Sequence, residues 1–82
     1  PVLDVNSNSR NPIINTRSFG EDPAAVGALA AEWIRGAREG GLLAVGKHFP
    51  GHGATETDSH IGLPRISASL EGLDTLELVP FR

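Results

Sequence analysis

Two short apolar runs, an amphipathic stretch and two polar loops make up most of the pattern along the chain. The first apolar run, at 2–5, has the length of a strand and predicts a buried β-strand. A polar stretch follows from 6 to 22, and its Asn, Ser, Pro and Gly residues predict a long irregular loop. Ile13, Ile14 and Phe19 lie within this loop and indicate that it is packed.

The stretch 23–39 has the apolar spacing of an amphipathic helix. Asp22 is a suitable N-cap, Pro23 suits the first helical position, and Gly40-Gly41 favours a left-handed stop. We therefore expect a helix over 23–39 that turns one apolar face toward the core. That face consists of Val26, Leu29, Ala30, Trp33 and Ala37.

A second apolar run begins at Leu42 and predicts a strand over 42–47. Its hydrophobicity is continuous rather than alternating, which is typical of parallel strands covered on both faces. Strand, helix and strand would form a right-handed βαβ unit, so the predicted fold class is α/β. A last helix is expected from Ser69, as N-cap, to about Val79. It would bury Leu70, Leu73, Leu76 and Val79.

Composition excludes several classes of function. Seven Lys and Arg against ten Asp and Glu give a net charge of −3 without a basic patch, so we expect no nucleic-acid partner. The absence of cysteine excludes disulfides, cysteine-ligated metals and a thiol nucleophile. No apolar run approaches the ~18 residues of a membrane span. With only 82 residues and apolar segments at both ends, we expect the chain to be a fragment of a larger domain.

Candidate chemistry collects in the two loops 6–22 and 46–62, which would leave the carboxyl ends of the two strands. In α/β proteins, loops at this edge of the sheet build the active site. Six side chains on these loops could therefore share one rim: Arg17, Lys47, His48, His52, Asp58 and His60.

Two chemical interpretations of this rim stay open at the level of the residues. A zinc site could use His48, His52, Asp58 and His60, although the loop is irregular and Lys47 would repel a cation. Alternatively, Asp58 and His60 would point to the same side of an extended segment. The carboxylate would then fix the imidazole tautomer and favour the protonated ring, making His60 a proton donor. An isolated Asp-x-His is also common in ordinary surface loops.

Read together, K-H-F-P-G-H-G at 47–53 and D-S-H at 58–60 resemble the signature of glycoside hydrolase family 3. The resemblance is strongest to its β-N-acetylglucosaminidase (β-hexosaminidase) branch. Residues 11–23 are similar to the family segment N-P-x-I-x-x-R-S-F-G-x-D-P, so the likeness extends over essentially the whole chain. It implies that residues 1–82 are an incomplete N-terminal catalytic domain: the βαβα portion, with parallel strands, of a (β/α)8 TIM-type barrel that takes ~250 residues in full.

The resemblance also implies an activity: hydrolysis, with retention, of terminal non-reducing β-linked N-acetylglucosamine. Substrates would be muropeptides or chitooligosaccharides, as in bacterial cell-wall recycling, and no cofactor is expected. His60 would be the general acid/base and Asp58 its partner, while Arg17, Lys47 and His48 would bind the sugar. The family's nucleophilic aspartate would lie outside this chain.

Other interpretations remain beside this one. Arg17 could pair with Glu21 as a structural clamp, and His52 could brace the loop through its backbone. A broader family 3 β-glucosidase is disfavoured, because those enzymes place a glutamate acid/base in a second domain and lack the D-S-H element. Phosphorolysis in place of hydrolysis, and a non-catalytic fragment with a structural or weak sugar-binding role, are further alternatives. The sequence departs from the family at Ala54, where Asp is frequent, and at Ser9, where Pro is frequent.

Overall fold

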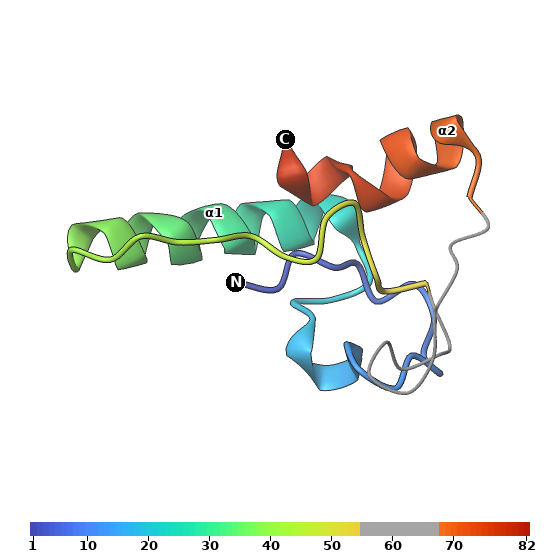
Figure 1. Cartoon of the computed structure of the whole chain (residues 1–82), viewed down its shortest axis with the longest axis horizontal. Helices are drawn as coiled ribbons and strands as arrows, with labels where there is room; N and C mark the ends of the chain where they lie inside the picture. Colours follow the sequence, from blue (N-terminus) through green and yellow to red (C-terminus); the bar gives the residue numbers. More distant parts are fainter. Residues whose placement is uncertain (55–67) are drawn as a thin grey trace.

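The computed structural model describes residues 1–54 and 68–82 of the chain. Figure 1 shows a long helix, α1, with the N-terminal segment and the segment that follows α1 on one side of it, and the C-terminal helical segments next to the start of the helix. The elements are the 3-10 turn η1 (Asn15–Arg17), the α-helix α1 (Pro23–Glu39), the α-helical turn α2 (Leu70–Gly72), the π-helical segment η2 (Leu73–Glu77) and the 3-10 turn η3 (Val79–Phe81).

Helix α1 begins and ends where the sequence predicts. The Asp22 side chain accepts a hydrogen bond from the Ala24 N–H at 3.1 Å, and Pro23 occupies the first turn. At the other end, Gly41 adopts a φ of +84°, which closes the helix in the left-handed conformation that glycine allows. Both ends are therefore determined by local chemistry.

The expected apolar face of α1 is only partly covered. Val26 and Ala30 are buried, as predicted, and the helix packs against η3. Leu29 and Trp33 are each 49% exposed, so the expectation that Trp33 points into the core is wrong. The reason is that these two side chains lie on a flank of the helix where no described element packs.

The two expected strands are reduced to a single parallel bridge between Val2 and Lys47. The Leu3 N–H donates to the Lys47 carbonyl at 2.6 Å, and the Lys47 N–H donates to the Pro1 carbonyl at 3.0 Å. The parallel direction agrees with the prediction, but the described residues contain no continuous strand. Leu43 is 99% exposed, so the expected cover on both faces of 42–47 is missing from the described part of the chain.

The C-terminal helical region starts at the predicted N-cap, where the Ser69 hydroxyl accepts a hydrogen bond from the Gly72 N–H at 3.0 Å. After one α-helical turn the backbone widens into η2, where the Leu78 N–H donates to the Leu73 carbonyl at 2.8 Å. The expected buried face is wrong in detail, because Leu70 is exposed and Glu77 is buried. The wider π turn rotates the later residues relative to an α-helical face.

The small core joins the N-terminal segment, the 6–22 loop and α1. Its apolar members are Leu3, Val5, Ile14, Val26 and Ala30. The burial of Ile14 confirms that the 6–22 loop is packed. Within the described ranges, no helix has both the length and the apolar character needed to cross a bilayer.

Candidate active site

Asp4 is the centre of the polar network at the end of the first apolar run. Its side chain is fully buried and accepts the backbone N–H of His52 at 2.6 Å and that of His48 at 3.1–3.2 Å. Its Oδ2 also lies 2.7 Å from Nδ1 of the His48 ring. A buried carboxylate is stable only when donors of this kind surround it. Asp4 therefore fastens the start of the 47–54 segment to the N-terminal segment.

The contact with Asp4 assigns the roles of the two His48 ring nitrogens. Nδ1 faces a carboxylate, which accepts hydrogen bonds, so Nδ1 carries a proton. In the neutral ring, Nε2 is then an acceptor that remains for a ligand. The His48 side chain is 39% exposed, while the Asp4 side chain is inaccessible. The ring is thus held from the inside and open to solvent on the outside.

Lys47 has a fixed backbone and an exposed side chain. Its N–H and carbonyl are both used in the parallel bridge with Pro1 and Leu3. The peptide bonds Lys47–His48 and Phe49–Pro50 are cis. Among residues 1–54 and 68–82, no ion pair engages the Lys47 ammonium group. The structure thus brings the two predicted sugar-binding residues, Lys47 and His48, side by side on one well-anchored segment.

Two asparagine side chains of the 6–22 loop donate hydrogen bonds to the 47–54 segment near His48. The buried Asn11 donates through Nδ2 to the His52 carbonyl at 2.5 Å, and its Oδ1 accepts the N–H groups of Ile13 and Ile14. Asn8 donates through Nδ2 to the Ala54 carbonyl at 3.3 Å. Since the N–H and carbonyl of His52 are both engaged, the interpretation of His52 as a backbone brace is confirmed.

Gly53 allows the closest approach in the site. A Cβ added there would lie 1.7 Å from the carbonyl oxygen of Val5, a distance that no side chain tolerates. The Gly53 carbonyl in turn accepts the Asn8 N–H at 3.3 Å. The second glycine of the sequence motif is therefore needed for contact between the two backbones.

Arg17 lies at the end of η1 and is exposed. Its Nη1 donates to the Ile13 carbonyl at 3.4 Å, and no ion pair with Glu21 occurs in the described part of the chain, so the alternative of a structural clamp is not observed. The neighbouring Ser18 hydroxyl donates to the Asp4 carbonyl at 2.7 Å. The residue next to Arg17 is therefore tied to the same N-terminal segment as His48, although no hydrogen bond between described residues joins the Arg17 and His48 side chains.

Asp58 and His60 lie outside the described residues, so their pairing stays a prediction. The zinc alternative also depends on these two residues. Within the two described ranges, no group of three or more histidine, aspartate or glutamate side chains is placed to hold a metal ion.

Two candidates for the functional site, Asp4 and Glu77, were not predicted from the sequence. An acidic residue within the apolar run 2–5 is the signal in the sequence that points to Asp4. Glu77 is 2% exposed and lies against Gly51 of the 47–54 segment. Burial, and then the charge of Asp4, raises the pKa of the Glu77 carboxyl.

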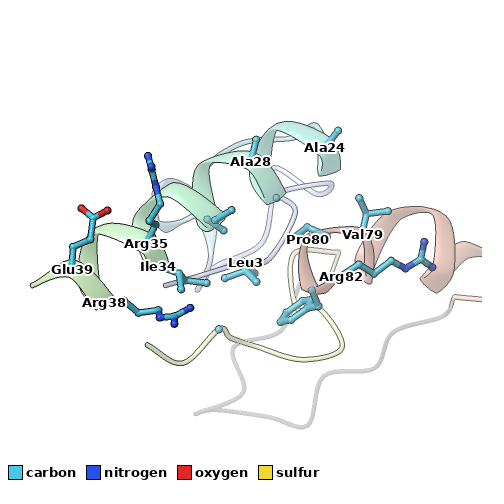
Figure 2. A pocket seen from close by; sticks show the side chains of 15 residues that line it. Leu3, Ala24, Ala28, Ile34, Arg35, Arg38, Glu39, Val79, Pro80 and Arg82 are labelled. Atoms are coloured by element: carbon cyan, nitrogen blue, oxygen red, sulfur yellow. The ribbon is translucent and has the colours of Figure 1, made fainter. Parts of the chain in front are cut away.

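A separate hollow lies between α1 and η3, and Leu3 and Gly46 also line it. Figure 2 shows small apolar side chains such as Ala28 along its wall, with Arg35, Arg38 and Glu39 toward one end. Of the described residues that line it, none is Arg17, Lys47 or His48. We therefore place the candidate active site at Asp4, Lys47 and His48, away from this hollow.

Comparison with known proteins identifies relatives that match nearly the whole chain. The chain is 46% identical over 81 residues to β-hexosaminidase A of Pseudoalteromonas piscicida, covering 99% of this chain and 14% of that protein. It is 44% identical to β-hexosaminidase of Pseudomonas aeruginosa (strain UCBPP-PA14), covering 99% of this chain and 24% of that protein. The chain thus spans about a quarter or less of the length of these relatives.

Solved structures show the same backbone. A glycoside hydrolase family 3 β-N-acetylglucosaminidase from Paenibacillus sp. str. FPU-7 superposes with a TM-score of 0.97 at 48% identity, covering 99% of this chain and 15% of that one. NagZ from Neisseria gonorrhoeae superposes with a TM-score of 0.88 at 45% identity, covering 99% of this chain and 23% of that one. The model of the glycosyl hydrolase family 3 N-terminal domain matches residues 1–82. The chain therefore belongs to glycosyl hydrolase family 3, as part of its N-terminal domain.

Proposed function

We propose that the protein carrying this chain is a retaining β-N-acetylhexosaminidase. Its relatives at 44–48% identity are named β-hexosaminidase, and NagZ from Neisseria gonorrhoeae has been solved in complex with N-trifluoroacetyl-D-glucosamine. The substrate is a terminal, non-reducing β-linked N-acetylglucosamine of muropeptide or chitooligosaccharide type. Residues 1–82 contribute a βαβα portion of a (β/α)8 barrel, and the nucleophilic carboxylate comes from outside these residues.

The Asp4–His48 contact is the observation that carries this proposal. A sugar hydroxyl is both a donor and an acceptor, so it is held best between one group of each kind. Lys47 supplies a donor, and His48, with Nδ1 turned to Asp4, supplies the acceptor Nε2. Arg17 adds a further donor from η1. Neither the amine nor the imidazole needs to change its charge to bind a hydroxyl in this way.

His60 and Asp58 carry the proton transfer in this proposal. Retaining hydrolysis needs an acid at the leaving oxygen in the first step and a base for water in the second step. One imidazole can do both, and Asp58 would keep it in a single tautomer. The first step breaks the glycosidic bond and forms a bond to the external carboxylate. The second step releases N-acetylglucosamine with its β configuration retained.

The test uses His60→Ala in the full-length protein, with two aryl β-N-acetylglucosaminides as substrates. With a poor leaving group, loss of the general acid lowers kcat/KM by about 10²–10⁴-fold. With a highly activated leaving group the first step needs less acid assistance, so the loss is much smaller. Thr55→Ala, five residues before His60 in the sequence, is the control and keeps the activity. Equal turnover of the poor substrate by His60→Ala and the unmodified protein would remove His60 from the mechanism.

Two further measurements distinguish this proposal from the alternative activities. Turnover of aryl β-glucosides in preference to β-N-acetylglucosaminides would favour the broader β-glucosidase function. Formation of N-acetylglucosamine 1-phosphate in phosphate buffer would favour phosphorolysis. We expect free N-acetylglucosamine as the product both in a phosphate-free buffer and in phosphate buffer.

A further inference from the structure

Glu77 is a buried acidic side chain to which the proposed mechanism gives no task. It ends the π-helical segment η2, and only 2% of the residue is exposed. Its Oε2 has no hydrogen-bond partner among the described residues. Buried carboxyl groups without a cation or donor are unusual, because removing them from water costs free energy. The contacts of the Glu77 side chain therefore indicate its role.

Glu77 lies directly against the turn that follows His48. A Cβ built on Gly51 would lie 2.5 Å from the Glu77 Oε2 and 2.9 Å from the Glu77 Cβ, so the two residues are in contact along the whole side chain. Gly51 has a φ of +139°, a backbone conformation that glycine adopts readily. The turn thus bends over the Glu77 side chain and leaves no space between them.

Asp4 reaches the same segment from the opposite end of the sequence. Its carboxylate holds the N–H groups of His48 and His52, which lie on either side of Gly51. Asp4 also acts electrostatically on Glu77, and, after burial, its negative charge is the second cause of the raised Glu77 pKa. A proton on Glu77 avoids a second negative charge beside Asp4. The segment is therefore held by one charged carboxylate through hydrogen bonds and by a second carboxyl through packing.

We propose that Glu77 is a positioning residue that supports the turn at Gly51 and thereby sets the place of His48 and Lys47 in the sugar-binding site. This inference rests on the proposed function, because it assigns the supported residues to a sugar. Removing the support would let the turn sink toward η2. The His48 ring would then lose its alignment with Asp4, and the sugar would bind less tightly.

The kinetic test compares Glu77→Ala, Glu77→Gln and the control Glu71→Ala in the full-length protein. Glu71 is an exposed acid on α2, in the same helical region. We expect Glu77→Ala to raise KM for an aryl β-N-acetylglucosaminide about tenfold, the effect of about 1.4 kcal/mol of lost binding, with little change in kcat. Glu77→Gln keeps the shape without a charge and restores KM to within about threefold of the unmodified value. Glu71→Ala leaves KM unchanged.

An NMR measurement keeps the inference testable whatever the catalytic activity proves to be. In protein labelled at histidine, the His48 ring signals are assigned by their loss in His48→Gln. We expect them to shift in Glu77→Ala and to stay in place in Glu77→Gln and Glu71→Ala. If Glu77→Ala fails to fold, Glu77→Asp, which is one methylene shorter, is expected to give a smaller shift in the same direction.

The outcomes separate the two proposals. Absence of N-acetylglucosaminidase activity in the unmodified protein would overturn the proposed function, and the His48 signals would still test the support by Glu77. Unchanged His48 signals in a folded Glu77→Ala would overturn the inference, as would a Glu77→Gln variant as impaired as Glu77→Ala.

Discussion

Replacing Asp4 with asparagine tests the centre of the site with a change of one atom. The carboxylate accepts three hydrogen bonds: from the His48 N–H, the His52 N–H and the His48 Nδ1. Hydrogen bonds to a charged group contribute about 1.5–3 kcal/mol each, against about 0.5–1.5 kcal/mol for neutral pairs. Losing about 1 kcal/mol at each of three donors lowers the free energy of unfolding by about 3 kcal/mol.

Asp4→Asn should also change the tautomer of His48. The Asn side chain has a single acceptor oxygen, which the short 2.6 Å contact from the His52 N–H would claim. The amide NH2 then faces Nδ1 of His48, and Nδ1 must become an acceptor with the proton moved to Nε2. A sugar hydroxyl that donates to Nε2 would lose this bond. KM should rise roughly three- to tenfold, the equivalent of about 0.5–1.5 kcal/mol.

Three assays on the full-length protein check this prediction. Urea unfolding gives the loss of stability, steady-state kinetics gives KM, and the nitrogen shifts of labelled histidine report the tautomer. The matched control is Asp22→Asn, because asparagine caps a helix about as well as aspartate and the change should stay within about 0.5 kcal/mol. If Asp4→Asn keeps both its urea midpoint and the Nδ1–H tautomer of His48, Asp4 does not orient the ring.

Three other predictions follow from the packing and charge of the site. Gly53→Ala brings a methyl group 1.7 Å from the Val5 carbonyl oxygen and should lower the free energy of unfolding by about 3 kcal/mol, whereas Gly36→Ala, with open space around it inside α1, should raise it by about 0.5–1 kcal/mol in the same urea experiment. Because the folded-state pKa of Glu77 lies above its ordinary value of 4.5, the contribution of Glu77 is fully present below about pH 4.5 and is lost as pH rises through the raised value. Glu77→Gln should remove this loss, so its Tm relative to the unmodified protein should increase between pH 4 and pH 8, and a constant difference would contradict the raised pKa of Glu77. Lys47→Ala should lower kcat/KM for the aryl β-N-acetylglucosaminide by roughly tenfold without changing Tm, because the side chain is exposed, and a parallel fall in Tm would indicate a structural role instead.

Local signals explain which parts of the fold were predictable. Asp22, Pro23 and Gly41 act within one helical turn of the ends they define, so the bounds of α1 followed from the sequence. The burial of 42–47 could not follow in the same way, because a strand is covered only when other elements pack beside it. The continuous apolar pattern predicts that such elements exist, and the described residues do not supply them.

The C-terminal region shows a different cause of error. A period of 3.6 residues placed Leu70 on a buried face, whereas the structure leaves it 80% exposed. The π-helical hydrogen bond from the Leu78 N–H to the Leu73 carbonyl adds a residue to the turn. This rotation brings Glu77 inward, and no periodicity argument that assumes an α-helix could have found it.

Site residues that belong to one contiguous motif could be predicted from the sequence. Partners that lie far apart in the sequence could not. Lys47 and His48 were found because they are adjacent in a long motif. Asp4 was missed as their partner because it lies 44 residues from His48, and only the fold brings the two together. Asp58 and His60 stay predictions that the proposed kinetics will test.

The dense bonding between the N-terminal segment and the 47–54 turn has a consequence for protein engineering. Asp4 and Asn11 supply hydrogen bonds to the backbone of this turn, and the Val5 carbonyl packs on Gly53. A designer who wishes to move the turn into another barrel must therefore transplant residues 4–11 along with residues 47–54. If the turn were exchanged alone, it would lack the hydrogen-bond partners that fix its conformation. A library that randomises only residues 47–54 would therefore yield mostly turns in other conformations.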